Sequence, residues 1–321
     1  MKLARFLPAL IVLTPLHAIA QDSYPNRPIQ MIVPYAPGGA ADIIARPLAQ
    51  GLDRELRQPI VIVNRPGASG AIGTQLCANA RPDGYTLCVA VVQISILPEV
   101  DILFGRTPSY TRKQLTGIAR LTAEPVVLMV GTATPWKTVQ ELLDAARRQP
   151  GAIKYATGGS YAGNHLPVAM LGQKAGVDLL AVPYKGGGPS MTAALGGEVP
   201  MTAQVPGVAY PHVQSGKMRA IAHSGLKPLS DFPGTPSLKD SGFDVEFYLW
   251  TGLFATRDLP KNVTAVLRGA TRKVMQSEEM RSTANKIRIE LGYQDQEEFN
   301  KWWDLDAARL IEVVRKVGKI E

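Results

Sequence analysis

The chain has 321 residues, of which 45% are hydrophobic and 19% charged, and its formal net charge is +8. This composition is that of an ordinary globular protein, long enough to bury a large core and to form two domains. Basic residues are scattered along the chain, and aromatic residues make up only 7%. The positive charge therefore favours small anionic ligands, and we expect no nucleic-acid partner.

The chain begins with a pattern typical of secretory signal peptides. Lys2 and Arg5 precede a mostly apolar stretch over 6–19, and Ala18-Ile19-Ala20 supplies small residues with the spacing of a cleavage site. The apolar stretch contains prolines and is short for a membrane span. We therefore expect a signal peptide over 1–20, cleavage after Ala20 and a periplasmic protein. An uncleaved N-terminal anchor is the alternative.

Short apolar strands then alternate with helices along the chain. The predicted strands are Gln30–Val33, Ile60–Val63, Tyr85–Val92, Val126–Val130, Ile153–Ala156 and Leu179–Val182. Three helices are predicted to begin in the loops after the first, second and fifth of these strands and to end at about Leu56, Ala80 and Ala175. Further helices are predicted over Thr138–Arg148, Val263–Gln276 and Gln296–Val317. This alternation predicts an α/β fold with largely parallel sheets.

Glycine-rich loops follow three of the predicted strands. The first, Pro37-Gly38-Gly39, opens a helix, and the others are 157–165 and 183–189. A helix start presents unpaired N–H groups and the positive end of the helix dipole, which suits a carboxylate or phosphate. A plain strand–helix turn that binds nothing is the alternative. Because these loops lie in two regions of the chain, we expect two lobes facing each other across a ligand cleft.

The lobe limits follow from the order of these elements. We expect the first lobe over 21–124 and 247–321, and the second over 125–246. Two cysteines, Cys77 and Cys88, flank a turn inside the first lobe. In an oxidising compartment such a pair can form one disulfide, which is our prediction, and two buried free thiols are the alternative.

Several short motifs cover essentially the whole mature chain in order: Tyr24-Pro25, the 33–42 loop, Gln58–Ala68, Arg81–Leu87, Val182–Gly186, Ala194–Val199 and Gly216–Ala220. Together they resemble the Bug family, the periplasmic solute-binding receptors of tripartite tricarboxylate transporters. The resemblance implies a two-lobed type II periplasmic-binding-protein fold that closes by a hinge around a small carboxylate. It also implies integral-membrane transporter subunits as partners, no cofactor, no metal and no catalysis. We expect a monomer.

The resemblance also assigns candidate ligand-binding residues. The first ligand loop would consist of Tyr35, Pro37, Gly38, Gly39, Ala40, Ala41 and Asp42, and the second of Gly159, Ser160, Tyr161, Ala162, Gly163, Asn164 and His165. Tyr161 is bulky for that turn, and His165 at a helix start is more often structural than a ligand contact. Lys185 is a candidate positive charge, although an exposed surface lysine is the commoner outcome.

The chain departs from the family pattern at two places near the expected cleft. It has Gln93-Ile94-Ser95 after the third strand, which makes Gln93 and Ser95 the candidates there, and Ala203-Gln204-Val205 in the second lobe. Relatives that bind amino acids have an Asp at the position of Gln204. A buried ammonium without an anionic partner is penalised. We therefore expect a ligand whose far end is neutral, apolar or a second carboxylate, unless Asp42 faces the ligand.

Two other classes of function compete with a binding protein. Gly159-Ser160-Tyr161-Ala162 follows a strand and precedes a helix, as in the nucleophile elbow of a secreted hydrolase, but Ala162 stands where that motif needs glycine. Nucleotide-binding glycine motifs and metal-ligand spacings are absent from the sequence. A receptor that signals to a membrane protein would share every residue above with a transport receptor.

Overall fold

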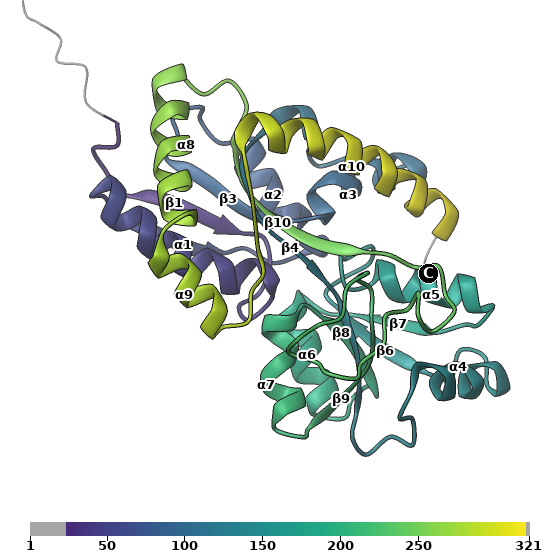
Figure 1. Ribbon diagram of the computed structural model, residues 1–321. Coiled ribbons are helices and arrows are strands. Elements are labelled where there is room, and N and C mark those ends of the chain that lie inside the picture. The colour runs from purple at the N-terminus through teal and green to yellow at the C-terminus, as the bar shows by residue number, and fades with distance from the viewer. Residues whose placement is uncertain (1–23, 319–321) are drawn as a thin grey trace, which may run out of the picture.

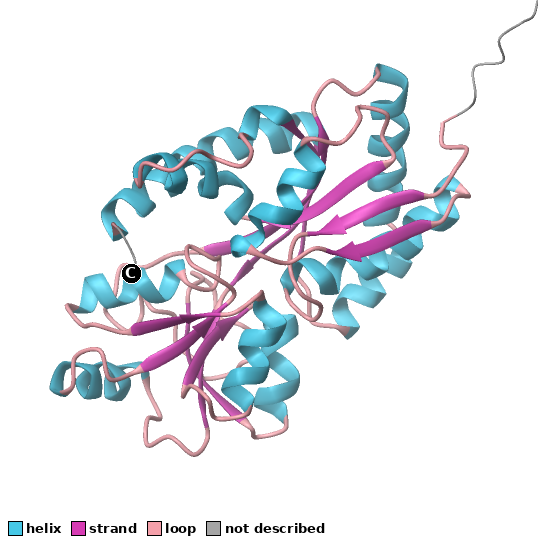
Figure 2. Ribbon diagram, turned by 180° about the vertical axis from the view of Figure 1, so that it is seen from behind, coloured by secondary structure: helices cyan, strands magenta, loops and turns pink. Residues whose placement is uncertain are grey.

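The computed structural model describes residues 24–318, so the predicted signal peptide lies outside the described residues. Figure 1 shows two sheets that lie end to end, each with its own helices. Seen from behind in Figure 2, helices cover both faces of each sheet. The larger sheet has six strands and the smaller has five.

The larger sheet, in the first lobe, has the strand order β11-β4-β10-β3-β1-β2. Its strands are β1 (Ile29–Val33), β2 (Ile60–Asn64), β3 (Thr86–Val91), β4 (Leu115–Pro125), β10 (Tyr248–Thr256) and β11 (Leu291–Asp295). Strand β1 pairs in parallel with β2 and β3, whereas β10 is antiparallel to β3 and β4. The prediction of a largely parallel sheet is therefore wrong for the half that contains β10.

The smaller sheet, in the second lobe, has the order β7-β6-β8-β5-β9. Its strands are β5 (Val127–Gly131), β6 (Lys154–Thr157), β7 (Leu180–Pro183), β8 (Met201–Gln204) and β9 (Met218–His223). Strand β6 is parallel to β7 and β8, and β5 is antiparallel to β8 and β9. The antiparallel pairs involve the strands next to the crossovers between the lobes: β10 in the larger sheet and β5 in the smaller.

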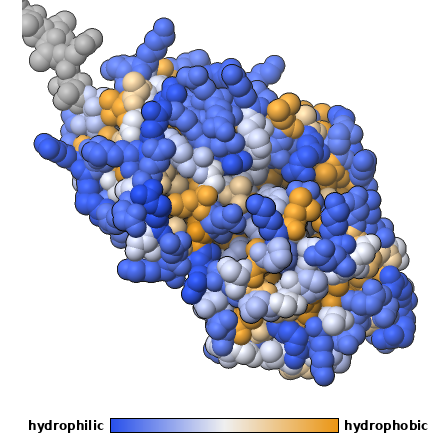
Figure 3. Space-filling view, in the orientation of Figure 1, coloured by the Kyte–Doolittle hydropathy of each residue, from blue (hydrophilic) through white to orange (hydrophobic). Residues whose placement is uncertain are grey.

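Ten α-helices lie within the described residues. They are α1 (Ala40–Leu56), α2 (Ala71–Ala78), α3 (Gln93–Leu103), α4 (Val139–Arg148), α5 (Leu166–Ala175), α6 (Gly187–Leu195), α7 (Pro206–Gln214), α8 (Lys261–Met275), α9 (Glu278–Lys286) and α10 (Gln296–Val317). There are also two short 3-10 turns, η1 (Ala68–Gly70) and η2 (Arg112–Gln114). No helix of the described segment is long and apolar enough to cross a membrane. Hydrophilic residues dominate the face in Figure 3, with hydrophobic residues in small groups.

The chain crosses between the sheets at two neighbouring places. Strand β4 ends at Pro125 and β5 begins at Val127, while β10 begins at Tyr248, whose Cα pairs with that of Pro125. The predicted lobe limits, 124/125 and 246/247, fall at these crossovers. The division into these lobes stays a prediction, and a pair of adjacent crossovers is the geometry that a hinge requires.

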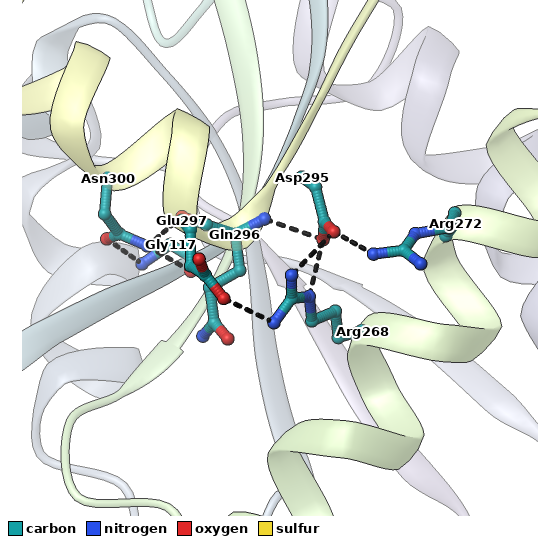
Figure 4. A network of polar contacts seen from close by, with 7 residues as sticks. All are labelled: Gly117, Arg268, Arg272, Asp295, Gln296, Glu297 and Asn300. Carbon is teal, nitrogen blue, oxygen red and sulfur yellow. Dashed lines mark hydrogen bonds and ion pairs between the residues drawn. The ribbon is translucent and has the colours of Figure 1, made fainter.

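A network of ion pairs fixes the start of α10 (Figure 4). Asp295 accepts from Gln296 N at 2.8 Å as the helix cap, and Arg268 of α8 binds both its carboxylate oxygens at 2.8 Å. Arg272 contacts the same carboxylate. The Arg268 hydrogen bonds lower the pKa of Asp295 to about 2. Asn300 then binds the backbone of Gly117 on β4, so α10 is tied to both α8 and the first sheet.

The two cysteines do not form the predicted disulfide. Cys77 on α2 and Cys88 on β3 are free and fully buried. Burial, and then a hydrogen bond between the two sulfur atoms, raises the pKa of Cys88 well above its ordinary value. Cys77 and Ala78 of α2 and Cys88 of β3 are all buried in the hydrophobic core, so the two thiols are part of the core packing. The alternative, two buried thiols, is therefore what the structure contains.

Candidate functional site

A cavity of about 40 Å³ lies where the loops of the two lobes meet. From the first lobe it is lined by Tyr35, Gly39, Ala40, Ala41, Val91, Gln93 and Leu249, and from the second by Gly158, Gly163, Asn164, Gly186, Gly187, Gln204 and Val205. The first-lobe residues follow β1, lie at or just after the end of β3, or belong to β10, and most second-lobe residues follow β6 and β7. Strand ends of both sheets therefore converge on one small space, as expected for ligand sites of open α/β sheets.

The start of α1 forms one wall of the cavity. Gly38 has a φ of +86°, a conformation that side chains other than glycine rarely adopt, and its N–H donates to Asp42 Oδ2 at 3.0 Å. This turn directs the next N–H groups, those of Gly39, Ala40 and Ala41, away from any acceptor within the described residues. Unpaired N–H groups at a helix start attract an anion.

Asp42 lies behind this wall. Its carboxylate accepts from Arg46 Nε at 2.9 Å and from Asn64 Nδ2 at 3.0 Å, in addition to Gly38 N–H. Burial raises the pKa of Asp42, but these hydrogen bonds outweigh burial and hold it below its usual value. Asp42 is buried and does not line the cavity. It shapes the loop as a charged cap and is not placed to meet a ligand.

Asn164 forms the opposite wall. Its Oδ1 accepts from Gly158 N at 2.9 Å, and its Nδ2 has no hydrogen-bond partner in the part of the chain that the structure describes. A backbone N–H can only donate, so the Gly158 contact fixes which amide atom is the oxygen. Asn164 is only 5% exposed. A buried unpaired donor is costly, and it marks a place where a ligand oxygen belongs.

Two glutamines complete the polar part of the lining. Gly163 N of the second lobe donates to Gln93 Oε1 of the first at 3.2 Å, and this leaves Gln93 Nε2 as the remaining donor. Gln204 uses its Nε2 for Gly187 O, Ser190 Oγ and Thr202 Oγ1 at 2.9–3.1 Å. Its Oε1 is thereby left as an acceptor at the cavity.

The lobes touch around the cavity through backbone atoms. Ala36 N donates to Lys185 O at 3.0 Å. A Cβ atom on Gly39 would lie 3.2 Å from Gly187 N, and one on Gly188 would lie 2.1 Å from Pro37 O. Only glycines permit this approach. The structure is therefore of a closed form, in which the third glycine loop covers the first.

The remaining candidate residues lie outside the lining. Ser95 Oγ accepts from Trp303 Nε1 at 2.7 Å beneath the site, and the side chain of Lys185 is exposed. His165 accepts from Tyr161 N at 2.8 Å through Nδ1, and burial lowers the pKa of His165 to about 4, so this histidine is neutral and structural. The others outside the lining are Pro37, Gly38, Gly159, Ser160, Tyr161 and Ala162.

Sequence reasoning missed several lining residues. They are Val91, Gly158, Gly186, Gly187, Val205 and Leu249. The glycine loop over 183–189 was a signal for Gly186 and Gly187. The apolar residues carry no such signal, because nothing in a short apolar strand shows which end meets the other lobe. Within the described residues, no group of His, Cys, Asp and Glu side chains is placed to hold a metal ion.

A two-lobed α/β fold with a ligand cleft between the lobes defines a periplasmic solute-binding protein, and solved structures of that class share it. The sequence model of one family, described as tripartite tricarboxylate transporter family receptor (TctC), matches residues 44–319. The chain belongs to this family. The predicted fold and the resemblance to Bug proteins are thereby confirmed.

Individual relatives agree with this assignment. A protein of Cupriavidus necator, the UPF0065 protein in the gbd 5' region, is 32% identical over 297 residues, which are 92% of this chain and 89% of the relative. Protein BugT of Bordetella pertussis is 30% identical over 267 residues, 81% of this chain and 79% of BugT. The periplasmic binding protein BugD has a solved structure that is 28% identical, with a TM-score of 0.86 over 93% of this chain and 99% of BugD.

Two similar structures were solved with carboxylates. Rpa4515 of R. palustris with adipate is 25% identical, with a TM-score of 0.85 over 92% of this chain and 98% of its own. MatC from Rhodopseudomonas palustris with bound malate is also 25% identical, with a TM-score of 0.83 over 90% of this chain and 99% of MatC.

Proposed function

We propose that the protein is an exported receptor that captures a small carboxylate between its lobes and delivers it to the membrane subunits of a tripartite tricarboxylate-type transporter. The observation that carries the proposal is the pairing of the free N–H groups at the start of α1 with the buried, unpartnered Asn164 Nδ2 across one cavity. Both are hydrogen-bond donors, and a carboxylate is the ligand that accepts from several donors at once.

The electrostatics of the cavity support a carboxylate. No Asp or Glu side chain is among the described residues that line it. Positive helix dipole ends reach it from both lobes, because α1 and α6 begin there. Adipate and malate in the two related structures are of the same chemical class.

The structure offers nothing in favour of the hydrolase alternative. Among the described residues, Ser160 makes no hydrogen bond to a histidine, and the nearby His165 already uses Nδ1 for the backbone of its own loop. A serine nucleophile needs a base within hydrogen-bond reach. We therefore propose a binding role without catalysis. We also propose that the protein acts as a monomer.

Gentle mass spectrometry of the purified mature protein tests the binding role. The intact complex is weighed before and after unfolding, and any released ligand is compared with a thermal-shift screen of mono-, di- and tricarboxylates. We expect at least one carboxylate to raise the melting temperature saturably. A screen in which no carboxylate does so would overturn the proposal.

The transport role needs a separate test, because a signalling receptor would bind through the same cleft. Uptake of the identified carboxylate is measured in cells with and without the gene. We expect uptake to be lost in the deletion strain and restored by the wild-type gene. Unchanged uptake, together with tight binding by the purified protein, would favour a signalling role.

A further inference from the structure

A groove of about 690 Å³ lies on the second lobe, between α4 and α5. Residues of β6 and β7 line this α4–α5 groove as well, and Val317 at the end of α10 contributes to it from the first lobe. It shares no lining residue with the cavity between the glycine loops. Ligand sites commonly have volumes of about 300–1,000 Å³. The groove is therefore large enough for a second small molecule.

Two buried polar side chains of the groove have no hydrogen-bond partner. Tyr155 and His165 are each 1% exposed, and their ring centroids are 5.9 Å apart. Because His165 Nδ1 accepts from Tyr161 N–H, the neutral ring carries its proton on Nε2. Within the described residues, neither this Nε2–H nor the hydroxyl of Tyr155 makes a hydrogen bond. Buried donors without partners are costly, and they mark a place where an acceptor on a ligand belongs.

Most of the remaining lining is apolar. Ala146 of α4 and Val168 of α5 are fully buried beside the groove. Leu180 of β7 also lines it and is 42% exposed, which is a large exposure for a leucine. A ligand with an apolar body would remove this surface from water and would be stabilised by doing so.

The charges near the groove favour an uncharged acceptor. Arg147 is exposed, and its Nη1 binds Asp144 at 2.6 Å. The carboxylate of Asp178 is exposed, and burial, together with this nearby negative charge, raises the pKa of Tyr155. An anion placed at the Tyr155 hydroxyl would be repelled by the same charge. Burial lowers the pKa of His165 to about 4, so its ring supplies no positive charge. A carbonyl oxygen accepts hydrogen bonds without bringing a charge.

We propose that the α4–α5 groove is a second binding site, for an uncharged, mainly apolar molecule whose carbonyl oxygen is bound by Tyr155 and His165. This site is separate from the carboxylate cleft, and it stands or falls independently of the proposed function. His165 directly follows Asn164, which lines the first cavity, and its Nδ1 holds the backbone of the same loop. The two sites therefore adjoin one loop without sharing a lining residue.

Acetophenone and ethylbenzene are probes of matched size, and only acetophenone carries a carbonyl oxygen. The mature chain contains three histidines, His165, His212 and His223, so nuclear magnetic resonance of protein with ¹⁵N-labelled histidine follows His165 directly. We expect acetophenone to shift the His165 Nε2 signal saturably and to bind about two- to tenfold more tightly than ethylbenzene. His212 and His223 do not line the groove, so their signals are internal controls.

A matched pair of variants locates the bound probe. Ala169 is a half-buried residue of α5 that lines the groove, and Ala169→Leu should fill part of it and weaken acetophenone binding at least about tenfold. Ala265→Leu on α8 is the control, because Ala265 is exposed on the first lobe. Undiminished binding in folded Ala169→Leu would place the probe elsewhere and overturn the proposal.

A second pair tests the hydrogen bond. Tyr155→Phe removes a hydroxyl without a partner, so the fold should persist while acetophenone affinity falls about two- to tenfold and ethylbenzene affinity stays the same. Tyr184→Phe is the control, because the Tyr184 hydroxyl binds Glu198 and does not line the groove. Equal acetophenone affinity in these two variants would overturn the assigned role of Tyr155.

Benzoate tests the charge of the ligand, since it has the same ring with a carboxylate. The part of its binding that is lost in Ala169→Leu reports on the groove, and we expect it to be at least about tenfold weaker than that of acetophenone. Tighter binding of benzoate in the groove would overturn the uncharged class. A His165 signal that none of the three probes shifts would overturn the site, and the carboxylate cleft would be unaffected.

Discussion

The hydroxyl of Tyr161 donates a hydrogen bond of 2.8 Å to the carbonyl oxygen of Gly318. Tyr161 belongs to the second-lobe loop that leads to Asn164, whereas Gly318 caps α10, which is tied to the first sheet. Gln173 on α5 makes a similar contact, since its Nε2 donates to Lys316 O at 2.7 Å. Figure 1 shows the described chain ending beside α5. The carbonyl groups at the end of α10 thus connect the two lobes in the closed form.

Tyr161→Phe removes the hydroxyl and should weaken closure. The lost hydrogen bond is worth about 0.5–1.5 kcal/mol, so ligand affinity should fall by roughly two- to tenfold. Titration calorimetry with the identified ligand measures the change. Tyr184→Phe is the control, because its hydroxyl binds Glu198 at 3.0 Å on the surface of the second lobe alone. The same affinity in both variants would contradict a role of Tyr161 in closure.

Gly39→Ala should prevent full closure. Its Cβ would lie 3.2 Å from Gly187 N, and backbone cannot move aside as a flexible side chain can. We expect ligand-induced thermal stabilisation to shrink sharply while the circular dichroism spectrum stays native. Gly269→Ala on α8 is the control, since a Cβ atom there would have no neighbour within 4 Å and the φ of Gly269 is ordinary. Full ligand stabilisation in Gly39→Ala would place the binding site elsewhere.

Glu124 should make the protein less stable as the pH rises. It is 1% exposed at the end of β4, and burial raises its pKa from 4.5 to about 8, while Glu290 N donates to it at 3.2 Å. Between these pH values the folded protein holds a proton that the unfolded chain releases, so the stabilisation present below pH 4.5 is lost as the pH approaches 8.

The change is a few kcal/mol at most, because one pKa unit corresponds to about 1.4 kcal/mol. Urea unfolding at about pH 5.5 and about pH 8 measures it in the wild type and in Glu124→Gln, where this pH dependence should disappear. Histidines also titrate in this range, but they are common to both proteins. Identical pH profiles would show that Glu124 ionises normally.

Cys77 and Cys88 should react with thiol reagents only after unfolding, because both are fully buried. Alkylation in urea without a reductant should label both cysteines, and alkylation of the native protein should label neither. Mass spectrometry counts the labels. An unfolded, unreduced protein without labels would mean that the two sulfur atoms are bonded after all.

The sequence was sufficient to predict the strands that precede glycine loops, because their pattern is local. It was not sufficient for β4 or β10, which are long antiparallel strands without flanking glycine loops. The segment that begins at Gln93, for which no helix was predicted, is the start of α3. Pro98 cannot bond to the carbonyl group of Ile94, and Tyr110, distant in sequence, donates its hydroxyl to that oxygen at 3.1 Å.

The residues of the candidate site could likewise be predicted only where a local sequence pattern or the family resemblance indicates them. Gly39 and Gly163 were predicted from the sequence because they belong to glycine-rich loops that follow strands, and Gln204 was predicted because the family resemblance places it where relatives have an Asp. The position of Leu249 at the cavity depends on how β10 returns to the first sheet, and no local pattern encodes that return. The free Nδ2 of Asn164 likewise depends on Gly158 binding its oxygen.

The order of the strands along the chain also sets the order in which the protein can fold during synthesis. All five strands of the smaller sheet lie in one uninterrupted segment, 127–223, so this half can assemble as soon as that segment is made. The larger sheet lacks a central strand until β10 emerges, and its edge strand β11 arrives later still. A nascent chain is therefore left with an incomplete sheet for most of its synthesis, and ligand binding begins only when the last part of the polypeptide has joined the first.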